Sequence, residues 1–300
     1  MKNYVIVTDS CSDLGKDLRE QYGIEYIPMT FSYDGKEMVA DLDWKGISLR
    51  EFYDLMRAGK RVITSQINAA TYKQAFEQYV KEGYDVLSIT CSSALSASIK
   101  ASQLARDELC KEYPDAKIIC VDSLNACAGL GMLCIRASEL RAEGKTIEEV
   151  AAWVEENKKY VNQEATVDKL SYLKQAGRVS AASAFFGGLL NVKPIIISDA
   201  IGQNVAVEKV KGRGVALHRV VERIAEEYDP TMCPFITILH ADCEADALKV
   251  KMDLIATMGI AEEYIRMGYI GPIIGATVGP GTIGVYCIGK EVAYVAKAKE

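Results

Sequence analysis

Residues 86–143 hold the stretch that decides the fold: VLSIT at 86–90, SALSASIKASQLARDELCKE at 93–112, KIICV at 117–121 and ACAGLGMLCIRASELRAE at 126–143. The short runs suit buried strands and the long runs are amphipathic helices. The same alternation precedes them, with strands predicted at 4–8 and 24–33 and helices at 15–22, 49–58 and 70–82. Strands alternating with helices of this length predict a parallel sheet covered on both faces.

The second half of the chain has a different texture. A capping box formed by Thr146 and Glu149 starts a helix predicted to reach residue 160. Strands are then expected at 194–198, 205–210, 235–239, 262–267 and 282–288, and helices at 215–228 and 244–258. We therefore expect an α/β protein of two domains, residues 1–160 around a parallel sheet and residues 161–300 around a mixed sheet. The uncharged segment 267–289 holds seven glycines, which favours buried strands and turns over a membrane helix.

Composition excludes several classes of protein. The 300 residues are 49% hydrophobic and 25% charged, which excludes a disordered chain. A net charge of −6 without a basic run argues against binding to nucleic acid. The nine cysteines include no C-x-x-C pair, so reduced thiols in a cytoplasmic protein without a zinc site are expected. Among them Cys11, beside a predicted loop, is the one to test for reactivity.

Hydroxyl side chains follow several predicted strands. Ligands of parallel sheets bind beyond the carboxyl ends of the strands. Thr8 and Ser10 flank Asp9 at one such end, and Ser93 and Ser96 follow another. A helix starting near Ser93 would direct free N–H groups outward and suit a small anion such as a carboxylate. Thr64, Ser65 and Gln66, just before the helix at 70, form a further hydroxyl cluster. The alternative is that Ser93 and Thr64 merely cap helices.

Other motifs carry weaker signals. Residues 279–284 match G-x-G-x-x-G, but a strand is predicted after them, so we reject a dinucleotide site. The group His240, Asp242, Cys243 and Glu244 is expected to cap a helix more readily than to bind a metal.

Basic residues near predicted loops, and one apolar segment, each leave two interpretations open. Arg178, Lys193, Lys211 and Arg213 would meet a phosphate or acidic partner, or form a solvated face. The uncharged stretch 179–192 is either a core helix or the wall of an apolar cavity.

Taken together, these motifs resemble the DegV family. The matching segments run along nearly the whole chain, and their order and spacing make them specific. They are Val7–Ser10 with Asp13-Leu14, Thr64–Gln66, Ser92–Ser96, Val121–Ser123, Gly177–Ser180, Lys193-Pro194, His240–Asp242 and Val278–Gly281.

The resemblance implies a function without catalysis by this chain. A family member would bury one long-chain fatty acid in an interior tunnel and present its carboxylate to a fatty-acid kinase subunit that makes acyl phosphate for phospholipid synthesis. It implies no catalytic residue, cofactor or metal in this chain. It also implies no integral membrane contact, and at most a transient contact with a membrane surface.

The resemblance also assigns residues. Thr64 and Ser93 correspond to the hydroxyls that hold the carboxylate, with Ser65 and Ser96 beside them. Arg178 and Arg213 match basic residues facing the partner. Lys211 stands where arginine is usual, and a lysine keeps the charge but cannot make the bidentate contact of an arginine. Thr277 replaces a frequent histidine. Two rival functions remain open, a serine- or cysteine-dependent acyl hydrolase using Ser93 or Cys11, and a carrier of another small anionic lipid.

Overall fold

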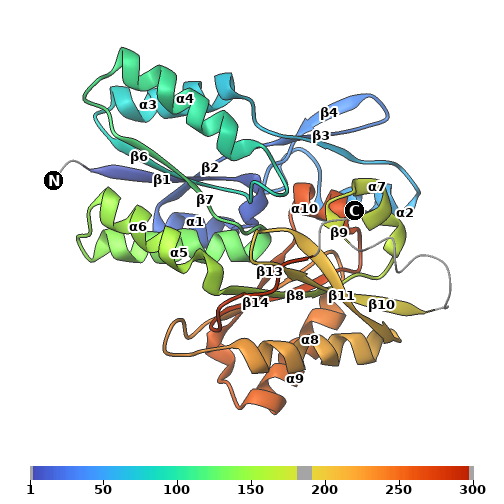
Figure 1. The fold of residues 1–300 in the computed structure, drawn as a ribbon. Coiled ribbons are helices and arrows are strands. Elements are labelled where there is room, and N and C mark those ends of the chain that lie inside the picture. Colours follow the sequence, from blue (N-terminus) through green and yellow to red (C-terminus); the bar gives the residue numbers. More distant parts are fainter. Residues whose placement is uncertain (1–2, 181–190, 297–300) are drawn as a thin grey trace.

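The first sheet consists of four parallel strands in the order β2-β1-β6-β7. In the computed structural model, which describes residues 3–180 and 191–296, these strands are β1 (Tyr4–Asp9), β2 (Ile24–Ile27), β6 (Asp85–Thr90) and β7 (Ile118–Asp122). Helices α3 (Ala69–Lys81) and α4 (Ser98–Glu112) lie on one face, and α1 (Lys16–Tyr22), α5 (Cys127–Ala142) and α6 (Ile147–Asn157) on the other (Figure 1). The predicted parallel sheet covered on both faces is confirmed.

The second sheet is mixed and has seven strands in the order β13-β12-β14-β8-β10-β11-β9. Its strands are β8 (Val161–Thr166), β9 (Val179–Ser180), β10 (Val192–Ser198), β11 (Asn204–Lys211), β12 (Ile236–His240), β13 (Ile265–Tyr269) and β14 (Ile283–Ile288). Helices α8 (Arg213–Glu227) and α9 (Glu244–Met258) cover its outer face (Figure 1). The mixed sheet is confirmed and all its strands follow residue 160, while the domain boundary itself stays a prediction.

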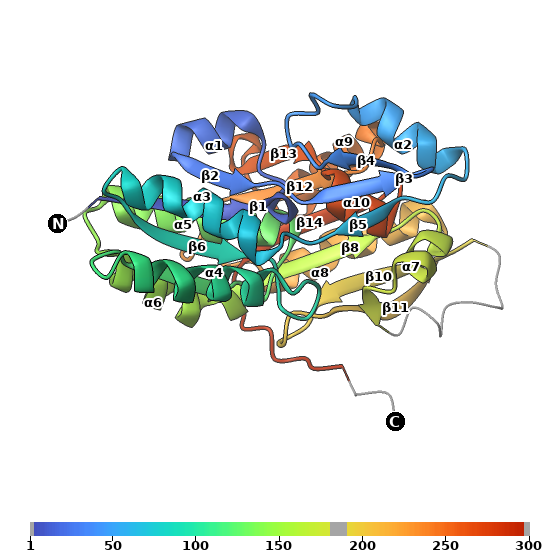
Figure 2. The same cartoon turned by 90° about the horizontal axis from the view of Figure 1, so that it is seen from above.

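A small antiparallel sheet, β4-β3-β5, was not predicted. It joins β3 (Thr30–Tyr33) to β4 (Lys36–Val39) and β5 (Ile63–Ser65), and it lies against α10 (Pro272–Val278), as does α2 (Leu49–Arg57) (Figure 2). The expectation of one strand over residues 24–33 was wrong. Pro28 has no N–H group to continue a ladder, and the residues on its two sides belong to different sheets.

Helix α5 is the shared core between the two larger sheets. Twelve of its sixteen residues are buried, and it contacts β1 and β6 of the first sheet and β8, β12 and β14 of the second. Residues 127–135 of this helix are all uncharged and buried, as expected for a helix segment that is enclosed in this way. Its burial places the carboxyl ends of β1 and β6 next to the second half of the chain.

The remaining helices include one that was predicted with its cap and one that was not predicted. The capping box of Thr146 and Glu149 is present at the start of α6. The uncharged segment 267–289 contains, besides β13 and β14, helix α10, which was not predicted. Helix α7 (Leu170–Ala176) and the one-turn helices η1 (Ser10–Ser12), η2 (Lys158–Tyr160) and η4 (Glu262–Tyr264) complete the described structure. No helix within residues 3–180 and 191–296 is both long and apolar enough to span a bilayer.

Candidate functional site

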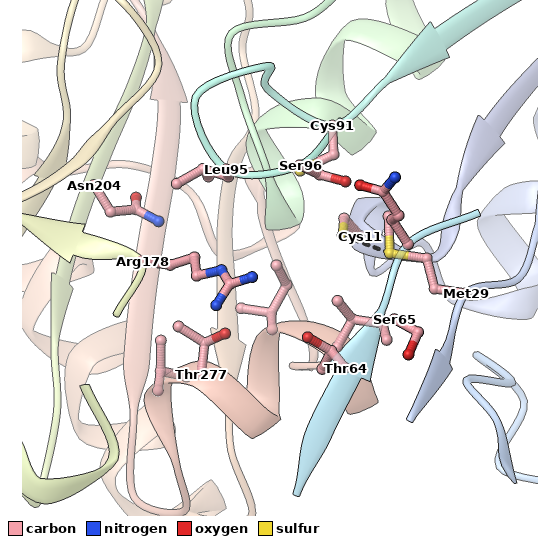
Figure 3. Close-up of a pocket in the computed structure, with 14 residues that line it drawn as sticks. Cys11, Met29, Thr64, Ser65, Cys91, Leu95, Ser96, Arg178, Asn204 and Thr277 are labelled. Carbon is pink, nitrogen blue, oxygen red and sulfur yellow. Dashed lines mark hydrogen bonds between the residues drawn. The ribbon is translucent and has the colours of Figure 1, made fainter. Parts of the chain in front are cut away.

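A cavity of about 400 Å³ opens where the carboxyl ends of β1 and β6 meet β5, β9 and α10 (Figure 3). Its volume falls within the range of ordinary small-molecule sites. Its lining is part polar and part apolar, and comes from both halves of the chain: Cys11, Met29, Thr64, Ser65, Gln66, Cys91, Leu95, Ser96, Arg178, Asn204, Ile273, Ile274, Thr277 and Val278.

One buried carboxylate builds the wall at the strand ends. Asp9 accepts the N–H of Cys11 at 2.9 Å with one oxygen and the N–H of Cys91 at 2.8 Å with the other. Burial raises the pKa of Asp9 to about 6, although both N–H groups act to lower it. Ser10 accepts the N–H of Met29 at 2.9 Å. Residues 8–10 thus hold lining residues in place through hydrogen bonds but do not line the cavity themselves.

Among the described residues four hydroxyl side chains line the cavity, three from β5 and the segment before α4, and the fourth, Thr277, from α10. Thr64 and Ser65 lie on β5, and Ser96 lies in the turn that leads into α4. The hydroxyl of Ser96 is 2.9 Å from that of Ser98, the first residue of α4, and accepts the N–H of Ser98 at 3.3 Å. Three of the hydroxyl residues singled out in the sequence are therefore brought together.

Ser93 is placed elsewhere. Helix α4 begins at Ser98, so the expected helix N-terminus at Ser93 was wrong. Ser93 is exposed, its N–H donates to Asp122 at 3.1 Å, and its side chain is not among those that line the cavity. The reason lies on the neighbouring strand: Asp122, the last residue of β7, accepts the N–H of Ser93, and residues 92–96 form a turn before the helix.

Arg178 supplies the one charged side chain among the described residues that line the cavity. Its guanidinium donates to the carbonyl oxygen of Ala176 at 2.7 Å and otherwise faces the space that Thr64 and Thr277 also face (Figure 3). Thr277 is half-buried on α10. A hydroxyl-lined space beside one guanidinium suits a single negative charge.

The other two predicted basic residues lie outside the cavity. Lys211 is exposed at the end of β11. Arg213 lines a separate pocket, where its Nε pairs with Asp246 at 3.0 Å and its guanidinium donates to the carbonyl oxygen of Gly281 at 2.6 Å. Arg213 therefore fixes the loop that follows α10.

The remaining predicted groups have structural partners or lie outside the described chain. His240 accepts the N–H of Cys243 at 3.2 Å, and Asp242 pairs with Arg57. Within the described residues no cluster of three or more His, Cys, Asp or Glu side chains could hold a metal. The segment 179–192, expected as either a core helix or the wall of an apolar cavity, falls mostly on residues 181–190, which lie outside the described residues.

Sequence reasoning missed the apolar wall that α10 provides. Ile273, Ile274 and Val278 face the cavity from this helix. Pro272 at its first position and the spacing of these residues were available signals. Met29 and Asn204 also line the cavity, and no local pattern singled them out.

Residues 3–290 match the model of the DegV family, a family of uncharacterised proteins. The chain belongs to the DegV family. A DegV domain-containing protein of Clostridium perfringens is 37% identical over 293 residues, which cover 96% of this chain and 98% of the relative. The family assignment implied by the sequence motifs is therefore confirmed.

Solved DegV structures share the fold, and several are described as binding fatty acids. A DegV protein from Thermus thermophilus described as binding fatty acid is 28% identical, with a TM-score of 0.84 over 97% of this chain and 100% of the other. DegV of Bacillus subtilis, described as a fatty-acid-binding protein, is 28% identical with a TM-score of 0.79 over 97% and 100%.

Proposed function

We propose that this DegV protein binds a long-chain fatty acid with its carboxylate at the hydroxyl side of the cavity and its acyl chain along α10. The observation that carries the proposal is the grouping of Thr64, Ser96 and Arg178 around one space that has an apolar wall. The two DegV proteins that are 28% identical and are described as binding fatty acids support the ligand class.

The polar contacts follow from the chemistry of the ligand. A carboxylate accepts hydrogen bonds, and the hydroxyls of Thr64 and Ser96 can donate them. Arg178 adds a charge-assisted contact. Ser96, in place of Ser93, takes the role that the resemblance gave to the second hydroxyl, because Ser96 lines the cavity. Each methylene group that leaves water contributes about 0.8 kcal/mol, so the chain supplies most of the affinity.

The family resemblance supports a further step, the presentation of the carboxylate to a partner kinase. A carboxylate oxygen would attack the terminal phosphorus of ATP held by the partner, forming the P–O bond of the acyl phosphate while ADP leaves. We assign no catalytic residue or cofactor to this chain. Arg178, Thr277, Lys211 and Arg213 are proposed to face the phosphate or the partner, and Lys211 is free to do so because it is exposed.

Two experiments test the proposal. Native mass spectrometry of the purified protein, with gas chromatography of its organic extract, should show one fatty acid per chain. A bacterial fatty acid kinase with ATP and oleate should make acyl phosphate when the wild-type protein is added and lose most of that activity with Thr64→Val/Ser96→Ala. An empty protein that takes up no added fatty acid would overturn the binding proposal, and undiminished acyl phosphate formation by the double variant would overturn the assigned site.

A further inference from the structure

Two thiols stand side by side on the wall of the cavity. Cys11 follows β1 and Cys91 follows β6, and these strands are neighbours in the parallel sheet. Each thiol is close enough to the other to shift its pKa. Both side chains line the cavity and occupy the same corner of it, beside Met29 (Figure 3).

Asp9 holds the two cysteines in place. Because its two carboxylate oxygens accept the N–H groups of Cys11 and Cys91, both backbones are fixed to one rigid group at 2.9 and 2.8 Å. The thiol of Cys11 donates a hydrogen bond to the thioether sulfur of Met29 at 3.7 Å, which holds the Cys11 side chain. The pairing is therefore part of the built structure of the wall.

The environment makes the two thiols unequal. The interaction with Cys91 and burial raise the pKa of the Cys11 thiol well above its ordinary value. The same interaction acts to lower the pKa of Cys91, but burial and the carboxylates of Asp9 and Asp122 leave the pKa of Cys91 raised as well. Cys91 is thus the easier of the two thiols to deprotonate, and a neutral product is favoured at this buried position.

We propose that Cys11 and Cys91 are an oxidation site that a small hydroperoxide reaches through the fatty-acid cavity and converts to a disulfide. The sulfur of Cys91 attacks the O–O bond, giving a sulfenic acid and releasing water from hydrogen peroxide. The sulfur of Cys11 then displaces the sulfenic hydroxyl group, which leaves as water with the thiol proton. Two thiols lose two electrons and the peroxide gains them.

The cavity couples this reaction to the ligand, a consequence that rests on the proposed fatty-acid function. Both sulfurs lie on the wall of the space that the carboxylate end of the lipid would fill. A bound fatty acid would therefore exclude the oxidant and protect the thiols. The disulfide in turn would alter the wall beside Ser96 and weaken lipid binding.

Oxidation with hydrogen peroxide tests the proposal on the whole protein. Reduced wild-type protein, stripped of lipid, is exposed to peroxide with and without oleate, then alkylated in denaturant and digested without reductant. Mass spectrometry should find a linked peptide that joins Cys11 to Cys91 and that dithiothreitol removes. Oleate at ten times its dissociation constant should slow formation of the link roughly tenfold, because only about one cavity in eleven is then empty.

Matched variants keep the test clear. Cys11→Ser and Cys91→Ser should each abolish the link, whereas Cys134→Ser, which changes a buried cysteine outside the cavity lining, should leave it unchanged. Recovery of Cys11 and Cys91 as fully alkylated thiols after peroxide treatment would overturn the proposal. A link that forms equally fast with oleate shown to be bound would overturn access through the cavity. Failure of oleate to bind would instead count against the fatty-acid function, and the link alone would then decide the oxidation site.

Discussion

The hydroxyl group of Tyr53 donates a hydrogen bond of 2.7 Å to the carbonyl oxygen of Ile270, and so ties α2 to the residues that lead into α10. The tyrosine is fully buried, and 217 positions separate the two residues. Because α10 carries the apolar wall of the cavity, this contact connects the packing of the first half of the chain to the shape of the site.

Tyr53→Phe should lower the free energy of unfolding by about 1–3 kcal/mol, since it leaves a buried carbonyl oxygen without its donor. It should also weaken oleate binding, because α10 is less firmly held. Tyr4→Phe removes a similar bond, from Tyr4 to the carbonyl oxygen of Lys145 at 3.1 Å, far from the cavity. Urea unfolding and oleate titration of both variants test this prediction. Equal oleate binding by the Tyr53 variant and wild type would show that this contact does not affect the site.

Asp13 should make the protein less stable as pH rises. Burial raises its pKa to about 8, whereas an unfolded chain has an aspartate pKa of about 3.9. Between these values the folded protein retains a proton that the unfolded chain has lost, so the free energy of unfolding falls as pH increases, by at most about 1.4 kcal/mol per pH unit from this group. Asp13→Asn should flatten the stability profile measured by urea unfolding between pH 5 and pH 8. A variant with the same slope as wild type would contradict the assigned protonation.

Glu164 and Arg223 form an ion pair between β8 and α8, with 2.7 Å between the carboxylate oxygen and Nε, and Glu164 is fully buried. Glu227 also faces Arg223, and burial raises the pKa of both carboxyl groups. Arg223→Met should destabilise the fold by about 3–5 kcal/mol, because it removes the partner of the buried Glu164 carboxyl group. Adding Glu164→Gln should recover part of the loss. Chemical denaturation measures the free energy of unfolding of both variants. A double variant as unstable as Arg223→Met alone would contradict the proposed role of the Glu164–Arg223 pair.

Arg178→Gln should weaken oleate binding by roughly fivefold, about 1 kcal/mol, because the exposed guanidinium contributes a partly screened attraction to the carboxylate. The remaining affinity should depend less on salt concentration. Lys211→Gln changes the same charge outside the cavity and should leave oleate affinity unchanged. Calorimetric titration with oleate at low and high salt compares the two variants. An equal loss of oleate affinity in both would contradict the prediction.

The alternation of strands and helices was predictable because local periodicity reflects burial. The central strand β8 was missed because its sequence, VNQEAT, looks polar, yet Asn162, Gln163 and Glu164 are buried. Their partners come from elsewhere in the chain: Asn162 donates to the carbonyl oxygen of Lys290 at 2.9 Å. Such compensation at long range leaves no trace in a local pattern.

The candidate site was predictable in its residue types and not in its geometry. Thr64 and Ser65 come from one motif that the sequence singled out and Ser96 from another, and all three line the cavity. Whether Ser93 or Ser96 faces it depends on where α4 begins, which is set by the contact of Ser93 with Asp122 on another strand. The adjacency of Cys11 and Cys91 likewise depends on strand order and on Asp9.

The measurement that tests the central claim most directly is the dissociation constant of oleate for wild type, Thr64→Val, Ser96→Ala and Ser93→Ala. Hydrogen bonds to a charged group contribute about 1.5–3 kcal/mol each, so the Thr64 and Ser96 variants should each bind at least about tenfold more weakly. The Ser93 variant should bind as wild type does, because its side chain does not line the cavity. Loss of affinity in the Ser93 variant with full binding by the Ser96 variant would contradict the account.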